Sequence, residues 1–529
     1  MARLSALELL AHLIRQIENH PLEIDRAMTS TTTVSRFKRF LIAVERIGNR
    51  LPSPALLFVW LAALIAAASC LASAAGWQVS LPSGVVEARN IVSADGLRWA
   101  LATMVDNFVG FAPVGAVLVT MLGLGVAEHS GLLRCVLLRL VRRARGPLLS
   151  FMVVLAGILS NLAFDVGYVL LIPLAGVLFQ LAGRPPLAGI AAAFAGVSAG
   201  YSANLLLGPA DVILAGITQE AMAGVASGYQ VSVASNYYFT AASTLVLALM
   251  GAWVTERWVA PFLMTTSAPG LDVEQDAQEL AAIQETPDDV RALWAVAGWT
   301  LFFAGWVLWA SVAIDAPLRS VDGTLELAML VPLIAIYAAI AGLIFGRLSK
   351  RYQAVGDMVA GMEAAMTTLA SYLVIMFFAA QCVAWFNWTG LGALIAASGA
   401  ALLSGLEGQS VLLLMGFIMV SAMINLFVGS ASAKWALLAP VFVPMLYLLG
   451  VSPEQAQMAY RIGDSSTNII TPLMPYFAVV VAFAARYRKN CGMGTLAAMM
   501  LPYSLSFLLG WSVLFAVWLL IGLPLGPQA

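Results

Sequence analysis

Long apolar stretches dominate the pattern of hydrophobic and polar positions along this chain. A helix that crosses the hydrocarbon core of a bilayer needs about 20 mostly apolar residues. Eleven stretches meet or approach this length, several of them interrupted by Gly, Pro, Asn or Asp: residues 54–75, 108–126, 187–207, 212–226, 237–254, 293–314, 328–345, 369–385, 412–428, 469–485 and 496–522. The pattern therefore predicts an all-α protein that crosses a membrane many times.

Two further apolar segments, residues 148–181 and 430–449, are interrupted by polar residues and proline. The interruptions are Asn161, Asp165 and Pro173 in the first and Ser432, Lys434, Pro440 and Pro444 in the second. Non-helical backbone at membrane depth is tolerated only where protein or water covers it. We therefore expect two re-entrant helical hairpins, with ordinary kinked spans as the alternative.

Composition supports a membrane protein and narrows its partners. Of the 529 residues, 61% are hydrophobic and 10% are charged, whereas soluble domains carry about 25% charged residues. The net charge of −1 supplies no basic field for nucleic acid, which we exclude as a partner. Membrane lipid is the expected surrounding.

Cysteine and histidine placement argues against metal, redox and enzyme chemistry. Cys70, Cys135, Cys382 and Cys491 lie far apart, and the sequence contains no CxxC or Cys/His spacing. We therefore expect no metal site of this type, no cofactor and no intramembrane enzyme. The sequence also lacks the GxxxxGK[ST] motif, which argues against ATP as the energy source.

Basic residues predict the orientation in the membrane. Five of them directly precede the first apolar stretch: Arg36, Lys38, Arg39, Arg46 and Arg50. Others lie within residues 134–145, 347–351 and 486–489. By the positive-inside rule these segments are cytoplasmic, including an N-terminal tail of residues 1–50. We expect residues 134–145 to lie on the membrane surface, and residues before Met28 to be dispensable.

An acidic linker divides the chain into two halves. Residues 258–290 contain seven acidic side chains and no Lys or Arg. The first half is then residues 51–257, with a hairpin at about 148–181. The second half is residues 291–529, with a hairpin at about 430–449.

The two halves share the spacing of their asparagines, prolines and glycines. Asn161 and Asn204 are 43 residues apart, and so are Asn425 and Asn468. Within each pair a proline, a glycine and a proline follow at steps of 10 and 3: Pro173, Gly183 and Pro186, and Pro440, Gly450 and Pro453. The flanking gaps are 12 and 18 residues in one half and 15 and 15 in the other, so the match requires a three-residue shift.

We interpret the halves as an inverted repeat. Each half would present an unwound helix whose Asn side chain and free backbone groups face a common cavity. Paired interrupted segments of this kind are the best sequence indication of a transporter site. The four asparagines should then converge near the bilayer midplane, about a pseudo-two-fold axis in the membrane plane.

From about Arg36 to its C-terminus the chain resembles the AbgT (aminobenzoyl-glutamate transporter) family. The motifs are SNLAFDVGY from Ser160, GPAD from Gly208, GSASAKWALLAPVFVPM from Gly429 and YRIGDSSTNIITPLMPY from Tyr460. The resemblance implies a homodimer in the bacterial inner membrane. Each protomer would have about nine transmembrane helices and two hairpins, as in the wider ion-transporter superfamily. It also implies uptake of p-aminobenzoyl-glutamate or export of sulfonamide-type antimetabolites.

Arg461 and Asp464 are ionisable residues inside a membrane segment, where each costs about 2.5–3.5 kcal/mol to insert. Their i, i+3 spacing allows them to pair with each other. A structural pair is one reading. The resemblance favours the other, in which Arg461 binds a substrate carboxylate while Asp464 orients it or takes up a proton. Aligned on the asparagines, their first-half counterparts are the uncharged Val197 and Gly200.

Lys434 and Trp435 lie near the expected tip of the second hairpin. A tryptophan at the membrane interface beside a snorkelling lysine is one explanation. An aromatic ring beside a cation also suits a ligand that carries an aryl ring and carboxylates. Ser432 is a helix cap or a ligand contact, and the resemblance favours the contact.

The remaining candidates are acids and prolines. Asp165 and Asp211 are proton carriers, cation ligands or structural partners of Lys434 or Arg461, and the resemblance favours Asp211. The resemblance also assigns importance to Pro453 and Pro472, which otherwise only start or break helices.

We therefore predict a secondary active transporter for an anionic aryl-carboxylate, driven by a proton or a sodium gradient. A membrane potential supplies about 2.3 kcal/mol per charge per 100 mV, which is enough to drive such transport. Coupling to sodium would place the ion near Asn161, Ser202, Asn204, Asn425, Ser466 and Asn468. The alternatives are a sodium-coupled carboxylate importer of the wider superfamily and an intramembrane enzyme.

Overall fold

The structure is a computed structural model that describes most of the chain after residue 53. The described residues are 54–81, 84–142, 146–163, 167–226, 228–266, 286–312, 317–319, 329–354, 356–471, 474, 476–488 and 491–527. The expected tail of residues 1–50, Asp165, Pro472 and residues 267–285 of the expected linker lie outside them.

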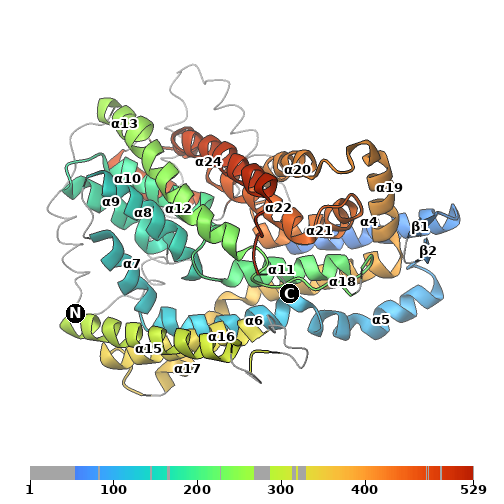
Figure 1. Cartoon of the computed structure of the whole chain (residues 1–529), viewed down its shortest axis with the longest axis horizontal. Helices are drawn as coiled ribbons and strands as arrows, with labels where there is room; N and C mark the ends of the chain where they lie inside the picture. Colours follow the sequence, from blue (N-terminus) through green and yellow to red (C-terminus); the bar gives the residue numbers. More distant parts are fainter. Residues whose placement is uncertain are drawn as a thin grey trace, which may run out of the picture. The chain divides into compact units, whose positions relative to one another are not determined.

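Within its described residues, the first half consists of helices, the loops that join them and one two-stranded antiparallel ribbon (Figure 1). Its elements are α4 (Pro54–Ala74), β1 (Gln78–Leu81), β2 (Gly84–Glu87), α5 (Ala94–Val109), α6 (Ala112–His129), α7 (Leu132–Arg142), α8 (Pro147–Ser160), η3 (Gly167–Leu171), α9 (Ile172–Leu181), α10 (Pro186–Phe194), η4 (Ala195–Ala199), α11 (Pro209–Met222), α12 (Tyr237–Val254), η5 (Thr255–Val259) and α13 (Ala260–Thr266). The expected linker therefore starts too early, because residues 258–266 continue the helical run that begins at α12.

The second half is also helical. Its elements are α15 (Pro287–Val312), α16 (Leu330–Leu348), α17 (Gly356–Thr368), α18 (Ala370–Trp388), α19 (Leu391–Leu402), α20 (Ser410–Asn425), α21 (Ala431–Leu448), α22 (Pro453–Thr467), η8 (Asn468–Ile470), α23 (Phe477–Tyr487) and α24 (Met493–Ile521). The apolar pattern predicts most of these helices, whereas it misses α17, α19 and α22 here, as it misses α5 in the first half.

The all-α membrane architecture is confirmed. Within the described residues, seven helices are long and apolar enough to cross a membrane, or eight if the bent pair Gly356–Thr368 and Tyr372–Trp388 is one span. Nine spans remain a prediction. Five apolar helices are shorter than a span: Pro147–Ser160, Gly167–Leu181, Pro186–Ala199, Leu391–Leu402 and Ser410–Asn425.

The second hairpin does not lie where the sequence pattern put it. Residues 431–448 form one continuous helix, α21, because Pro440 and Pro444 are accommodated inside it. The break comes earlier, between α20 and α21. The same order occurs in the first half, where α8 and η3/α9 flank the break that follows Ser160. Each half thus has one helix on either side of a break.

The repeated glycine and proline end and start equivalent helices. Gly183 and Gly450 both have left-handed backbone, with φ of +69° and +84°. After each, an equivalent hydrogen bond closes the preceding helix: Arg184 N donates to Phe179 O at 2.8 Å, and Val451 N donates to Leu446 O at 3.0 Å. Pro186 and Pro453 then begin α10 and α22. The sequence repeat is therefore a structural repeat.

A matched close approach of helices also recurs in both halves. A Cβ added to Gly196 would lie 2.3 Å from Val154 O of α8, and one added to Gly463 would lie 2.4 Å from Ile418 O of α20. Glycine allows these backbones to touch, as small residues do in other membrane proteins. The two contacts fix which residues of α10/η4 and of α22 correspond.

The basic segment forms an amphipathic helix, α7, as the pattern predicts.

At the end of α6, Tyr352 lies 3.2 Å from His129 Nδ1 and donates to Val126 O at 3.1 Å. Burial raises the pKa of Tyr352 to about 12, so its hydroxyl keeps the proton at neutral pH.

Candidate functional site

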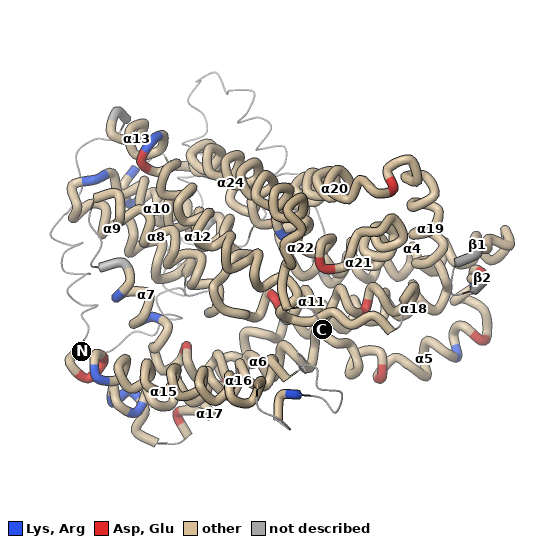
Figure 2. The backbone as a smooth tube through the Cα atoms, viewed as in Figure 1, with Lys and Arg blue, Asp and Glu red and all other residues tan. Residues whose placement is uncertain are grey.

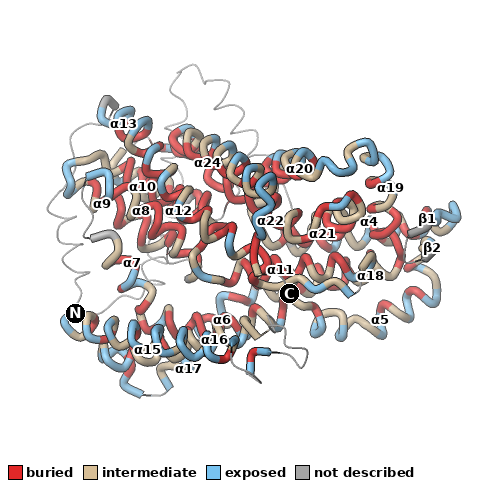
Figure 3. Tube along the Cα trace, in the orientation of Figure 1, coloured by how far each residue is buried: buried red, intermediate tan, exposed pale blue. Residues whose placement is uncertain are grey.

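Helix α22 carries the polar face around which the site is built. Ser452 and Gln455 form a capping box at its N-terminus, and Pro453 occupies its first turn. Four buried polar side chains then recur at helical spacing: Gln457, Arg461, Asp464 and Asn468. Figure 3 shows α22 among the largely buried elements, whereas α5 and α15 are mostly exposed.

Arg461 joins the two halves through an ion pair with Asp211. Arg461 Nη2 lies 2.7 Å from Asp211 Oδ1 and donates to the Ser202 carbonyl at 3.0 Å. Asp211 Oδ2 accepts from the Gly208 N–H at 2.8 Å and so caps α11. Asp211 is therefore the structural partner of Arg461, one of the alternatives that the sequence left open.

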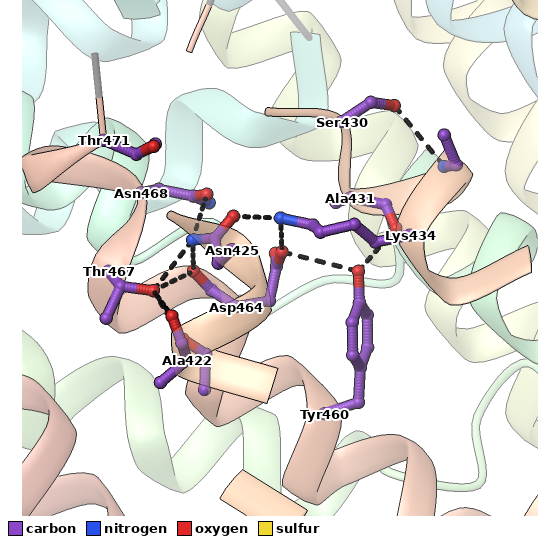
Figure 4. A network of polar contacts seen from close by, with 12 residues as sticks. Ala422, Asn425, Ser430, Ala431, Lys434, Tyr460, Asp464, Thr467, Asn468 and Thr471 are labelled. Carbon is purple, nitrogen blue, oxygen red and sulfur yellow. Dashed lines mark hydrogen bonds and ion pairs between the residues drawn. The ribbon is translucent and has the colours of Figure 1, made fainter. Parts of the chain in front are cut away.

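The pairing of Arg461 with Asp464, which their spacing allows, does not form. Asp464 pairs instead with Lys434 of α21, whose Nζ lies 2.5 Å from Asp464 Oδ1 (Figure 4). Each charge on α22 thus finds its opposite on a different neighbouring helix. All four side chains are at least nine-tenths buried, where an unpaired charge would be strongly unfavourable.

In the second half the two asparagines bind each other. Asn425 Nδ2 donates to Asn468 Oδ1 at 2.9 Å, to Thr467 Oγ1 at 2.8 Å and to the Asp464 carbonyl at 2.6 Å. Asn425 Oδ1 accepts from Lys434 Nζ. The break before α21 is therefore joined to the end of α22 by side-chain amides (Figure 4).

In the first half both asparagines donate to the same carbonyl group. Asn161 Nδ2 and Asn204 Nδ2 lie 3.1 and 3.3 Å from Ile158 O. Each predicted pair is therefore brought together, by a direct contact in one half and through a shared carbonyl in the other. The orientation of the axis that relates the halves remains a prediction.

The interrupted segments of the two halves also touch. Besides the bond from Arg461 to Ser202, Ser198 Oγ donates to Met474 Sδ at 3.0 Å. The break that follows α10/η4 therefore faces the break that follows α22.

Trp435 lies in the interior of the protein. It is 0% exposed, and its Nε1 donates to Thr218 Oγ1 at 3.0 Å. Its ring stacks on Tyr460 with centroids 4.5 Å apart. Tyr460 in turn donates to Ala431 O and lies 3.4 Å from Asp464 Oδ1, so the aromatic pair adjoins the ion pairs.

The other predicted residues have simpler surroundings. Ser432 is half-buried in the first turn of α21. The Ser466 hydroxyl donates to Ile462 O of its own helix at 2.6 Å. Ser202 Oγ is buried and has no hydrogen-bond partner among the described residues. Within those residues, no group of three or more His, Cys, Asp or Glu is arranged to hold a metal ion.

Sequence reasoning missed Tyr460, Thr218, Gln457 and Asn236. Gln457 accepts from Asn236 Nδ2 at 2.5 Å, and both residues are buried. Gln457 precedes Arg461 by one helical turn, so extending the polar stripe backwards from Arg461 would have identified it. Thr218 and Asn236 could not be identified from this stripe, because they lie in the first half and not on α22.

Lys434, Arg461 and Asp464 belong to the second half only, but the first-half counterparts of Arg461 and Asp464 differ from those that alignment on the asparagines gives. The matched Gly196 and Gly463 contacts put Arg461 opposite Phe194 and Asp464 opposite Val197, instead of Val197 and Gly200. The three-residue shift falls after Gly196, which is why alignment on the asparagines was wrong here. Figure 2 shows how few charged residues lie where α11, α21 and α22 meet.

Comparison with known proteins gives consistent matches over nearly the whole chain. Residues 39–529 match the sequence profile described as the "AbgT putative transporter family". The p-aminobenzoyl-glutamate transport protein of Escherichia coli (strain K12) is 33% identical over 509 residues, which cover 95% of this chain and 98% of that protein.

Two solved structures share the fold. The YdaH transporter of Alcanivorax borkumensis is 48% identical, with a TM-score of 0.83 over 90% of this chain and 100% of that one. MtrF of Neisseria gonorrhoeae, reported as illuminating a class of antimetabolite efflux pumps, is 44% identical, with a TM-score of 0.87 over 93% and 100%.

Proposed function

This chain belongs to the AbgT family of membrane transporters, and from that membership we propose that it is a secondary active transporter of anionic aryl-carboxylates related to folate. The proposed substrates are p-aminobenzoyl-glutamate and sulfonamide-type antimetabolites. The relatives named for p-aminobenzoyl-glutamate transport and antimetabolite efflux support this class.

The observation that carries the proposal is the incomplete pairing of Arg461. Its Nη2 contacts Asp211, but its Nε is buried without a hydrogen-bond partner among the described residues. A carboxylate that binds the Nε and Nη2 edge makes two parallel hydrogen bonds. Asp211 binds only Nη2 of this edge, because its second oxygen accepts from the Gly208 N–H and so caps α11.

A substrate carboxylate would therefore compete with Asp211 for the guanidinium. On binding, the substrate carboxylate would replace the Asp211 carboxylate as the negative partner of Arg461. It would also loosen the link between α11 and α22, which joins the two halves. Substrate binding and relative movement of the halves are thereby coupled through one side chain.

The test is the affinity of purified protein for p-aminobenzoyl-glutamate, measured by calorimetry. Arg461→Ala removes a charge-assisted contact of about 1.5–3 kcal/mol, which corresponds to more than tenfold weaker binding. Arg98→Ala is the matched control, since Arg98 is exposed on α5 and pairs locally with Asp95. Equal affinity in both variants and in the wild type would refute the proposed site.

The proposed driving force is a proton or a sodium gradient. Flux of labelled substrate into sealed proteoliposomes, with a pH or a sodium gradient imposed separately, identifies the ion and the direction. Accumulation without any gradient would contradict secondary active transport.

We also propose a homodimer in the bacterial inner membrane with a cytoplasmic N-terminus. The support is the amphipathic basic α7 and the large apolar side chains exposed on α15, among them Trp294, Phe302 and Trp309. Such a surface requires lipid or a second copy to cover it. The mass of the purified protein by light scattering, corrected for detergent, distinguishes a dimer from a monomer.

A further inference from the structure

The contact between Asn236 and Gln457 leaves two buried polar atoms unused. Asn236 directly precedes α12 of the first half, and its Nδ2 donates to Oε1 of Gln457 on α22 at 2.5 Å. The other polar atoms of the two amides, Asn236 Oδ1 and Gln457 Nε2, have no hydrogen-bond partner among the described residues. The two residues are 2% and 1% exposed. A buried polar atom without a partner is unfavourable, so each of the two requires a reason.

The two unused atoms are complementary. A side-chain amide carries one acceptor oxygen and one donor NH2 group. Because the shared bond uses the donor of Asn236 and the acceptor of Gln457, an acceptor is left on Asn236 and a donor on Gln457. Exchanging oxygen and nitrogen in both amides swaps the roles of the two residues but leaves one donor and one acceptor as before. The contact therefore offers one of each, on opposite sides of the boundary between the first half and α22.

A second amide pair, between α5 and α18, satisfies its buried member. Gln381 is 6% exposed, and its Oε1 accepts from Asn107 Nδ2 at 3.1 Å. Its Nε2 donates to Met104 O at 2.9 Å. Gln381 thus uses both of its polar atoms, whereas neither Asn236 nor Gln457 does. An incomplete amide pair is therefore not a general property of this fold.

The incomplete pair lies one helical turn from Arg461. Gln457 and Arg461 are four residues apart on α22, so their side chains lie on the same face of the helix, with a rise of about 6 Å between them. Both contact the first half, Gln457 through Asn236 and Arg461 through Asp211. A ligand that takes the place of Asp211 on Arg461 therefore lies at the boundary that the amide pair spans.

Unpartnered buried polar atoms gather at this boundary. Within the part of the chain that the structure describes, they are Ser202 Oγ, Asn236 Oδ1, Gln457 Nε2 and Arg461 Nε. Small-molecule sites contain a few placed polar groups that fix the orientation of the ligand. The Arg461 guanidinium suits a carboxylate, whereas the two amide atoms suit a neutral group that has one N–H and one carbonyl oxygen.

We propose that Asn236 and Gln457 form a subsite that recognises a secondary amide of the ligand. The ligand N–H donates to Asn236 Oδ1, and the ligand carbonyl oxygen accepts from Gln457 Nε2. Because N–H and C=O of a trans amide point in opposite directions, one ligand amide joins the first half to α22.

The inference rests on the proposed function and deepens it. In p-aminobenzoyl-glutamate an amide links the aryl carbonyl to the amino acid, and a carboxylate is attached to the next carbon atom. Arg461 binds this carboxylate while Asn236 and Gln457 bind the amide. The protein is then selective for an acylated amino acid, and the same aryl ring and carboxylates without the amide N–H bind less tightly.

Two ligands that differ only in the linking group test the subsite. The first is p-aminobenzoyl-glutamate, and the second is its ester analogue, in which an oxygen atom replaces the amide N–H. Calorimetry on the purified full-length protein gives both affinities, and their ratio cancels any effect that a substitution has on both ligands alike. The wild type should bind the amide about tenfold more tightly, because the ester leaves Asn236 Oδ1 without a partner.

Four variants assign the preference to its residues. Asn236→Leu removes the acceptor and should bind amide and ester equally. Asn236→Asp keeps an acceptor oxygen and should retain the preference, whatever its absolute affinity. Gln457→Met should weaken both ligands to a similar extent, since both carry the carbonyl group. Asn107→Leu, from the second amide pair, is the matched control and should keep the wild-type ratio.

Equal affinity of the wild type for amide and ester overturns the inference, and so does a preference that persists in Asn236→Leu. The two buried atoms would then bind water only. The wild-type ratio needs no variant, so it decides the matter if Asn236→Leu does not fold. If Arg461→Ala weakens binding but the amide is not preferred, the proposed function stands and this inference fails. Absence of binding of either ligand by the wild type contradicts the proposed function itself.

Discussion

At the scale of single residues, the ion pair of Arg461 and Asp211 connects two halves that share no other buried ion pair among the described residues. Removing one member leaves the other charge buried and unpaired, at a cost of about 3–5 kcal/mol. Removing both leaves no such charge.

We therefore expect Asp211→Asn and Arg461→Gln each to lower the free energy of unfolding by about 3–5 kcal/mol, and the double variant to be more stable than either single one. Chemical unfolding followed by tryptophan fluorescence gives the four values of the cycle. Strictly additive losses would mean that the two side chains do not interact.

Two substitutions of Trp435 separate the contribution of its ring to stability from that of its hydrogen bond. Trp435→Ala should destabilise the protein by about 3–5 kcal/mol, because a fully buried ring that stacks on Tyr460 is lost. Trp435→Phe keeps a ring and removes the bond to Thr218, at a cost of about 1 kcal/mol. Equal unfolding temperatures for the two variants would show that the ring contributes little to packing.

At the scale of elements, the contact of α20 with α22 depends on Gly463. A Cβ there would lie 2.4 Å from Ile418 O, which is backbone and cannot move away without displacing the helix. Separation of the helices would stretch the bonds from Asn425 to Asp464 and Asn468.

Gly463→Ala should therefore reduce both transport and thermal stability. Gly196→Ala should affect the first half in the same way, through Val154 O. Gly416→Ala is the control, because a Cβ on Gly416 of α20 meets nothing within 4 Å. If Gly463→Ala and Gly416→Ala have the same activity and unfolding temperature, the close approach has no role.

Most elements were predictable, because the length of an apolar stretch and the glycines and prolines that end it are local properties of the sequence. Residues 237–254, for example, were predicted exactly as far as α12 extends. The position of the second hairpin was not predictable, because prolines in a sequence indicate a helix break, whereas α21 contains Pro440 and Pro444 without interruption. Short helices such as α19 were missed because they are well below the length of a span.

The composition of the site was predictable, but its pairings were not. Ionisable residues inside apolar sequence singled out Lys434, Arg461 and Asp464. Spacing along α22 suggested the partner three residues away. The actual partners lie on α11 and α21, so they are set by tertiary packing, which local spacing does not encode.

At the scale of the whole molecule, the helix pairs α8/α9 and α20/α21 differ in the charge of their outer ends. We call the end of each pair that lies away from its break the base. At the base of the first pair, Arg184 donates to Gly146 O and pairs with Glu256 at 2.5 Å. Gly146 follows shortly after the basic α7 in the sequence. At the base of the second, residues 403–409 and 449–454 contain Glu407 and Glu454 and no Lys or Arg. By the positive-inside rule we expect the first base to be cytoplasmic and the second to lie on the opposite side of the membrane.

Cysteine labelling tests this inverted arrangement. In a Cys70→Ser background, which removes the exposed native cysteine, Ala182→Cys and Ser404→Cys place single thiols at the two bases, where both residues are exposed. An impermeant maleimide added to intact cells should label position 404 and not position 182. Labelling of both positions or of neither would contradict an inverted repeat.

The Arg461–Asp211 link also has a consequence for how the protein is made. Asp211 enters the membrane 250 residues before its counter-ion is synthesised, which at about 5–20 residues per second is a delay of about 12–50 s. During that interval the carboxylate has the backbone N–H of Gly208 to bind. A nascent chain released before Arg461 therefore retains an uncompensated acid within the bilayer. Incomplete translation products should for that reason be recognised and degraded by membrane proteases more rapidly than the finished chain.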